Sequence, residues 1–140
     1  MATDFSFGTK AETLERLAPL VRRAEVLDLT YFPVSDWLAD PDAVLERLAA
    51  DYGEQILAVR SSATGEDSAE GSMAGAFMSR LGVDGGNRQA LQSAIADVVA
   101  SYSGNPNDQV LVQPMLDDVA LSGVIMTHDL QRGSPFYVIE

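Results

Sequence analysis

Arg60 stands where an apolar run of the 140-residue chain meets a long loop of small residues. The apolar run covers residues 56–59, and the loop is rich in serine, glycine and alanine up to residue 76. Small residues allow backbone N–H groups and hydroxyls to approach a ligand closely, which suits a phosphate. Arginine adds a fixed charge and a planar fork of donors for phosphate oxygens. The pattern favours a phosphate site and leaves open a second interpretation, a mobile surface loop after an edge strand.

Lys10, the only lysine in the chain, is a second candidate for binding an anion. Thr9 can cap a helix whose third residue is Glu12, a capping-box pattern that places Lys10 in the first turn. The helix dipole disfavours a cation at this end, and a bound phosphate would resolve that conflict. The alternative is a solvated lysine without a role. Arg80, on the strand expected after the loop, would add to a small positive focus with Arg60.

Gln113 is a third candidate, because it interrupts an apolar strand expected at residues 110–115. If its amide is buried, it needs hydrogen-bond partners, and a ligand can supply them. The alternative is an outward polar residue in the ordinary alternation of a strand.

Composition excludes several classes of function. A formal net charge of −12 argues against nucleic-acid binding, which needs a basic surface. The absence of cysteine excludes disulfides and thiolate metal sites. No apolar run approaches the roughly 18 residues of a membrane span and no secretory segment opens the chain, so we expect a cytoplasmic protein without membrane contact.

These residues must be positioned by helices and strands. The pattern of expected helices and strands predicts one α/β (α+β) domain over residues 1–140, with a mixed sheet and about three helices. The expected helices cover residues 10–21, with a kink or break at Pro19, 42–52 and 87–102. The expected strands cover 26–32, 56–59 and 77–83, followed by an antiparallel C-terminal part at 110–115, 120–127 and 136–139. Trp37 is expected in the core.

Residues 59–77, VRSSATGEDSAEGSMAGAF, resemble a family signature. It belongs to the nucleotide-binding domain shared by phosphoenolpyruvate synthase, pyruvate phosphate dikinase and rifampicin phosphotransferase, an ATP-grasp fold. VRSSA, the acidic ED and the SxAG turn match in one register. Residues 8–10, GTK, resemble the family's GGK, and VLVQPML with SGVIMTHD resembles its VQ-x-M and GV-x-F-T segments. The chain is therefore expected to form the N-terminal part of an ATP-grasp nucleotide-binding domain.

The resemblance implies that ATP is the ligand and that five residues bind it: Lys10, Arg60, Gly75, Ser79 and Gln113. The two cations would hold phosphates, and the 72–75 turn would close over them through backbone N–H groups. Gln113 would contact the nucleoside. Ser79 stands where the family has a threonine, and it keeps the hydroxyl. His128 lacks the sequence context of the family's phosphohistidine, so we assign it no catalytic role.

The resemblance also implies partners. The family's Mg²⁺ ligands lie on strands of the second half of the domain, so the ligands for Mg²⁺ are expected outside this chain. We do not assign the metal to the acidic loop residues Glu66, Asp67 and Glu70, because their spacing does not set an octahedral geometry. The expected partners are the remaining half of the domain and phosphohistidine or acceptor domains, in cis or in trans.

The sequence thus predicts the ATP-binding portion of an ATP-dependent phosphotransferase, a kinase or dikinase that is not catalytically complete in this chain alone. The competing hypothesis is a nucleotide-binding or regulatory module that retains the fold without phosphoryl transfer.

Overall fold

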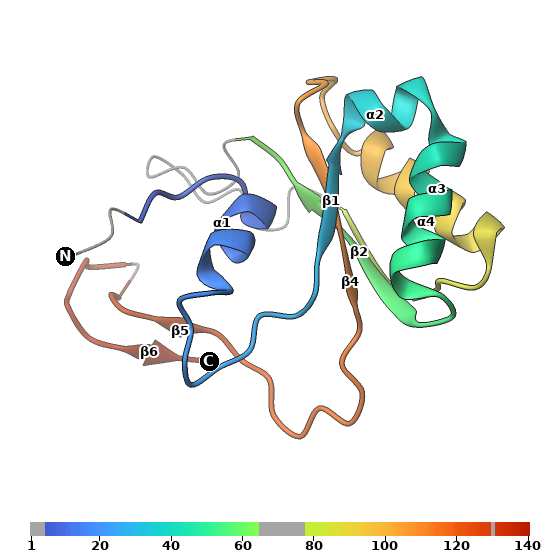
Figure 1. Ribbon diagram of the computed structural model, residues 1–140. Helices are drawn as coiled ribbons and strands as arrows, with labels where there is room; N and C mark the ends of the chain where they lie inside the picture. The colour runs from blue at the N-terminus through green and yellow to red at the C-terminus, as the bar shows by residue number, and fades with distance from the viewer. Residues whose placement is uncertain (1–4, 65–77, 130) are drawn as a thin grey trace.

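A four-stranded sheet crosses the centre of the molecule (Figure 1). The structure is a computed structural model that describes residues 5–64, 78–129 and 131–140. The strands follow the order β1-β4-β2-β3, and every neighbouring pair is antiparallel. Their bounds are β1 Thr30–Pro33, β2 Ile56–Ser62, β3 Ser79–Asp84 and β4 Gln109–Pro114.

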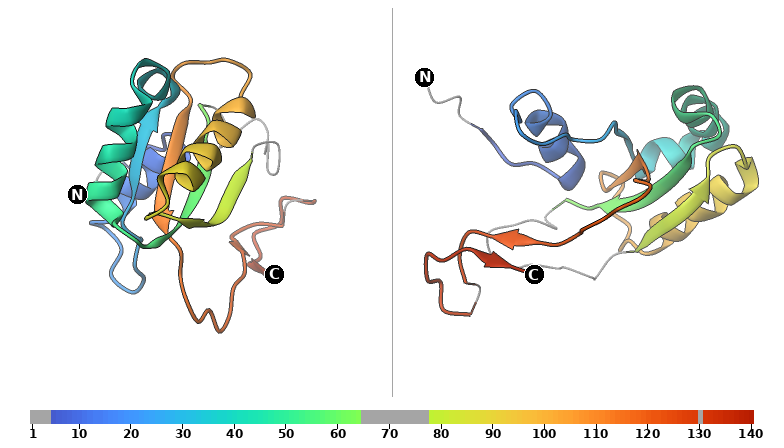
Figure 2. Two further views of the ribbon diagram at one scale, coloured as in Figure 1. Left: turned by 90° about the vertical axis from the view of Figure 1, so that its right-hand side faces the viewer. Right: turned by 90° about the horizontal axis from the view of Figure 1, so that it is seen from below.

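Helices lie on both faces of this sheet (Figures 1 and 2). Three of the described helices lie on one face: α2 Val34–Ala39, α3 Pro41–Tyr52 and α4 Arg88–Ala100. The helix on the other face is α1 Lys10–Leu17. A separate small antiparallel pair is formed by β5 Ile125–Met126 and β6 Val138–Ile139. None of the described helices is long and apolar enough to cross a membrane.

The hydrophobic core lies between the sheet and the helices α3 and α4. Buried residues recur at helical spacing on both helices: Val44, Leu45, Leu48 and Tyr52 on α3, and Leu91, Ala94, Ile95 and Val98 on α4. The sheet contributes alternate residues of its two central strands: Leu57 and Val59 on β2, and Val110 and Val112 on β4. We call this side of the sheet the core face. Fully burying one such aliphatic side chain stabilises the fold by about 1.5–3 kcal/mol.

Local capping residues fix the ends of α3 and α4. The side chains of Asp40 and Asn87 accept hydrogen bonds from the backbone N–H groups three residues later, at 3.0 and 3.1 Å. Gly53 ends α3 with a φ of 57°, a conformation that favours glycine. The helices predicted at 42–52 and 87–102 are therefore confirmed to within two residues.

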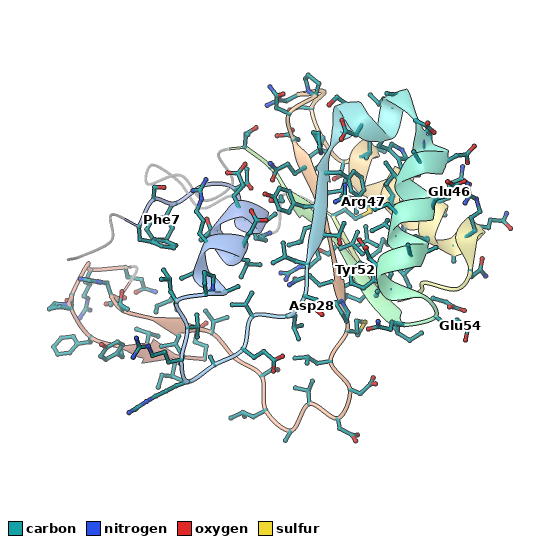
Figure 3. The ribbon with its side chains drawn as sticks, viewed as in Figure 1. Phe7, Asp28, Glu46, Arg47, Tyr52 and Glu54 are labelled. Atoms are coloured by element: carbon teal, nitrogen blue, oxygen red, sulfur yellow. The ribbon has the colours of Figure 1, made fainter. Side chains whose placement is uncertain are left out.

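Tyr52, the last residue of α3, points toward the sheet (Figure 3). Its hydroxyl lies 3.1 Å from both Thr30 Oγ1 on β1 and the Val112 carbonyl oxygen on β4. Burial raises the pKa of this hydroxyl above its ordinary value. One polar contact thus ties the helix to two strands of the core face.

The α+β class is confirmed, but the strands differ from the prediction. We expected a mixed sheet, whereas every strand pair among the described residues is antiparallel. The strand expected at 26–32 begins only at Thr30. The strand at 110–115 does not open the C-terminal part, because β4 lies between β1 and β2. Its apolar residues are buried on both faces, as is typical of a central strand.

The helices also differ in two respects. α1 ends at Leu17, before Pro19, so the proline ends the helix instead of kinking it. Leu20, inside the expected range 10–21, lies beyond the end of α1 and is 49% exposed. The short helix α2 was not predicted. It carries Trp37, which lies in the core as expected.

Candidate functional site

The face of the sheet opposite the core face carries most of the predicted site, and we call it the α1 face. On β2 the alternation that turns Leu57 and Val59 to the core turns Ala58, Arg60 and Ser62 the other way. This face is met by α1 and not by α3 or α4 (Figure 2, left). Strand alternation therefore separates the core residues of β2 from its candidate ligand residue.

The strand register brings Ser79 beside Arg60. Arg60 lies opposite Ser79 on β3 and opposite Leu111 on β4. Directly opposed residues of an antiparallel pair share a face, with Cβ atoms about 4.5–5.5 Å apart. Arg60 is partly buried, and its guanidinium makes no hydrogen bond or ion pair with the described part of the chain. Both side chains therefore lie next to each other on the α1 face.

Gln113 lies on the same face, two positions from the level of Arg60. It pairs with Ala58 on β2 and is only 7% exposed. Its amide forms no hydrogen bond with the described residues, yet none of their fully buried side-chain polar atoms lacks a partner. The amide of Gln113 is therefore accessible to solvent, although the residue as a whole is nearly buried. The position fits the predicted inward amide, while its contact with a nucleoside stays a prediction.

Lys10 reaches the end of β2 from a distant part of the sequence. Thr9 and Glu12 form the predicted capping box, which begins α1 at Lys10. The Lys10 Nζ atom donates to the Ser61 carbonyl oxygen at 3.3 Å. Ser61 follows Arg60 directly, so Lys10 contacts the residue next to Arg60 although the two cationic residues are fifty positions apart in the sequence.

Polar contacts dock the first turn of α1 on the sheet. The Ala11 N–H donates to Ser62 Oγ at 2.9 Å. Thr9 Oγ1 donates to Gln109 Oε1 at 2.6 Å, and Gln109 Nε2 donates to Glu12 Oε1 at 2.9 Å. Ser62 and Gln109 are opposite each other in the strand register, so the helix is held by two neighbouring strands. The capping box is visible in the sequence, whereas the roles of Ser62 and Gln109 are not.

These contacts change the ionisation of two groups near α1. The Gln109 amide and then the Thr9 backbone N–H hold the pKa of Glu12 below its ordinary value of 4.5. At the other end of the helix, Tyr31 on β1 donates to Glu15 Oε2 at 2.7 Å. This hydrogen bond, with a smaller effect of burial, raises the pKa of Tyr31 to about 12. The strands β1, β2 and β4 thus each give α1 or its cap at least one polar contact.

The point where β2 leads into the small-residue loop is also held by hydrogen bonds. The backbone N–H and Oγ1 of Thr64 both donate to Asp108 Oδ1, at 3.0 and 2.7 Å. Asp108 is only 4% exposed, whereas Thr64 is exposed, so the contact is partly buried. The 72–75 turn with Gly75, and the acidic residues 66, 67 and 70, lie outside the described residues. Thr64 is therefore the last residue described before residues 65–77.

Arg80 does not join the positive focus that we expected. It lies opposite Val59, so its side chain projects on the core-face side, where its guanidinium meets Asp97 on α4 at 2.6 Å. The register between β2 and β3 shifts between Leu57 and Val59, and this irregularity helps to decide which β3 residues share the face of Arg60. The prediction for Arg80 was wrong.

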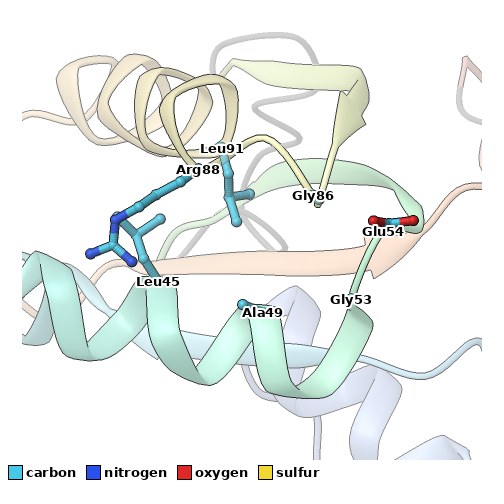
Figure 4. Close-up of a pocket in the computed structure, with 8 residues that line it drawn as sticks. Leu45, Ala49, Gly53, Glu54, Gly86, Arg88 and Leu91 are labelled. Carbon is cyan, nitrogen blue, oxygen red and sulfur yellow. The ribbon is translucent and has the colours of Figure 1, made fainter.

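One pocket among the described residues lies on the core-face side of the sheet, away from Arg60. A pocket of about 250 Å³ lies between α3 and α4, with Leu45 and Leu91 on its walls and Arg88 at its edge (Figure 4). Arg88 is already paired with Asp42 at 2.5 Å. In the described ranges no group of three or more His, Cys, Asp or Glu side chains is placed to hold a metal ion.

Comparison with known proteins now identifies the class of the domain. Residues 41–140 match the family described as pyruvate phosphate dikinase, AMP/ATP-binding domain. This match covers most of the chain, so the chain belongs to that family and the resemblance seen in the sequence is confirmed. The sheet with helices on both faces is compatible with an N-terminal portion of an ATP-grasp-like domain. No curated protein and no solved structure matches the chain.

The family match bears unequally on the predicted site. Arg60, Gly75, Ser79 and Gln113 lie inside the matched residues, whereas Lys10 lies outside them. The placement of Lys10 at the site therefore rests on the fold, through its contact with Ser61.

Proposed function

We propose that this AMP/ATP-binding domain holds the phosphates of ATP at the end of β2, on the α1 face, as part of a phosphotransferase. The observation that carries the proposal is the contact of Lys10 Nζ with the carbonyl oxygen of Ser61, the residue after Arg60, at the end of β2 that leads into the small-residue loop. In a chain of net charge −12, a tetra-anion needs such a local pair of cations.

The two cations have different tasks in this proposal. The Arg60 guanidinium has no partner among the described residues, so its fork of donors is available for two phosphate oxygens. The Lys10 ammonium acts as a point charge beside it, at the level of Ser61. Ser79, opposite Arg60, adds a hydroxyl donor. Gly75, which lies outside the described residues, is proposed to add its backbone N–H on the strength of the family resemblance alone.

Gln113 is proposed to contact the nucleoside. Gln113 lies opposite Ala58, which is two residues before Arg60 on β2. It is therefore on the same face as Arg60, two strand positions away from the proposed phosphate site. An amide offers both a donor and an acceptor, which suits a base edge or a ribose. The accessible amide of this nearly buried residue supports the assignment.

Mg²⁺ and the phosphoryl acceptor are proposed to come from other parts of the enzyme, in cis or in trans. The described residues do not fit a metal site, because they bring no cluster of carboxylates together. Phosphoryl transfer depends on positioning and on neutralising charge with metal ions. In this proposal the residues of this chain bind and orient ATP and carry out no step of transfer.

The test is a calorimetric titration of the chain with ATP, AMP and adenosine, each with and without Mg²⁺. We expect saturable binding of ATP that is tighter than that of adenosine, since the cations act on phosphates. Equal binding of ATP and adenosine, or no binding of either, would contradict the proposal. Binding of ATP without any turnover, even after the remaining part of the domain and an acceptor domain are added, would support the competing function, a regulatory nucleotide-binding module.

A further inference from the structure

The attachment of α1 to the sheet differs from that of the other long helices. α3 and α4 bury stripes of four residues each, whereas Ala11 is the buried residue of α1. The last leucine of α1, Leu17, is only half-buried. The position of α1 therefore depends strongly on its hydrogen bonds to the strands.

Gln109 is central to that attachment, because its amide uses both functions at once. Its oxygen accepts from Thr9, the N-cap of α1, and its nitrogen donates to Glu12, the capping-box partner. Thr9 and Glu12 are in turn joined through their backbone N–H groups, at 3.2 Å each. A carboxylate at position 109 would repel Glu12, and an aliphatic residue would bind neither group.

The contacts of Gln109 also affect the position of Lys10, because Lys10 lies between Thr9 and Glu12, the two residues that Gln109 binds. The Gln109 side chain is on β4, directly opposite Ser62 on β2, and Lys10 Nζ reaches the neighbouring Ser61 carbonyl. Any shift of the first turn along the sheet therefore moves the Lys10 ammonium relative to Arg60.

We propose that Gln109 is a positioning residue for the phosphates of ATP. It contacts no ligand itself, and it fixes the first turn of α1 on β4 so that the Lys10 ammonium lies beside Arg60. The inference rests on the proposed function, in which Lys10 binds phosphate, and it assigns to Gln109 a role that acts through Lys10 alone.

The first experiment needs no nucleotide, because Lys10 is the only lysine of the chain. Selective ¹³C- and ¹⁵N-lysine labelling gives NMR signals from this one side chain. We expect Gln109→Ala to shift the Lys10 side-chain signals, and Gln89→Ala, which removes an exposed amide from α4, to leave them unchanged. Unchanged Lys10 signals in folded Gln109→Ala would overturn the inference. ATP that leaves the parent's Lys10 signals unchanged would instead overturn the phosphate role of Lys10, and the inference with it.

The second experiment is a double-mutant cycle on ATP affinity. Gln109→Ala should weaken ATP binding about threefold to tenfold in the parent and in the Arg60→Ala background, within the range of one interaction. In the Lys10→Ala background the same change should have no further effect. A full effect of Gln109→Ala in that background would show that it acts through the fold and would overturn the inference.

A pair of variants that exchanges the amide and the carboxylate between positions 109 and 12 keeps the test decisive if Gln109→Ala does not fold. Gln109→Glu alone places two carboxylates together and should weaken ATP binding and shift the Lys10 signals. The double variant Gln109→Glu with Glu12→Gln again offers Thr9 an acceptor and restores a donor between the two positions. It should recover both the parent affinity and the parent Lys10 signals. Failure of this rescue in a folded protein would count against the positioning role.

Discussion

The two faces of the sheet are built from the same strands and differ in what holds them. On the core face, Leu57, Val59, Val110 and Val112 are fully or almost fully buried against α3 and α4. On the α1 face, the neighbouring residues of the same strands are largely polar, and α1 is attached by side-chain hydrogen bonds. Alternation along a strand thus places the apolar core on one side and the proposed ligand site on the other.

This division makes the effects of mutations separable. A change on the core face alters the free energy of unfolding with little effect on the ligand, because its side chains do not reach the α1 face. A change on the α1 face alters affinity with a smaller effect on unfolding. A mutation that strongly altered both would break the comparison.

The largest effect is expected on the core face, from Leu48→Ala. Leu48 is 1% exposed, so its truncation leaves a cavity and should lower the free energy of unfolding by about 2–5 kcal/mol. Leu38→Ala makes the same chemical change at a residue that is 69% exposed, and it should change stability by less than about 0.5 kcal/mol. Urea unfolding of the two variants measures the difference. Equal losses would contradict the assigned core.

Arg60→Ala should have the next largest effect, on affinity. Losing a charge-assisted contact to phosphate should cost about 1.5–3 kcal/mol, or about tenfold to hundredfold in the Kd for ATP. Arg80→Ala is the matched control, since Arg80 is one register position away on the other face and pairs with Asp97. Calorimetry should show parent affinity for Arg80→Ala. Equal weakening by both changes would mean that net charge, and not the site on the α1 face, controls binding.

Local features of this site could be predicted from the sequence, and distant ones could not. The junction at Arg60 and the capping box at Thr9 and Glu12 depend on neighbouring residues, so their patterns are visible in the chain. The insertion of β4 between β1 and β2 depends on strand pairing across the whole chain. The contact of Thr9 with Gln109 joins residues 100 positions apart, and neither residue type indicates the other.

The errors have the same physical origin. Arg80 follows the expected strand pattern, but its face is decided by its register with Val59, beside the irregularity in the β2–β3 pair. The helix expected at 10–21 is shorter in the structure and is docked largely through polar groups, whose partners lie on distant strands. Side-chain alternation predicts that two faces exist. It does not predict which face each strand presents to a given helix.

Gln113→Leu should weaken ATP binding by a smaller amount, about 0.5–1.5 kcal/mol or twofold to tenfold, because a neutral hydrogen bond is lost. A contact with the nucleoside predicts a similar factor for ATP, AMP and adenosine. Arg60→Ala should weaken ATP binding far more than adenosine binding. Calorimetry with the three ligands distinguishes the two patterns. A loss confined to ATP would place Gln113 at the phosphates instead.

The smallest effect is expected from the protonation of Glu12. Its pKa is lowered in the folded chain, so its contribution to stability is present above its ordinary value of 4.5 and is lost as pH falls through the lowered value. NMR titration of the Glu12 carboxyl should give a midpoint below 4.5 in the parent. In Gln109→Ala the midpoint should rise toward 4.5, since the first cause of the shift is removed.

The same titration compares the two faces through their helices. Loss of the Glu12 charge should release the first turn of α1 from β4, while α3 and α4 stay packed by apolar contacts that do not depend on that proton. Amide exchange followed as the pH falls should therefore accelerate at residues 10–13 before it does in α3 and α4, and Glu12→Gln should remove much of this early change. Simultaneous opening of all three helices would show that polar docking on the α1 face is not separable from the core.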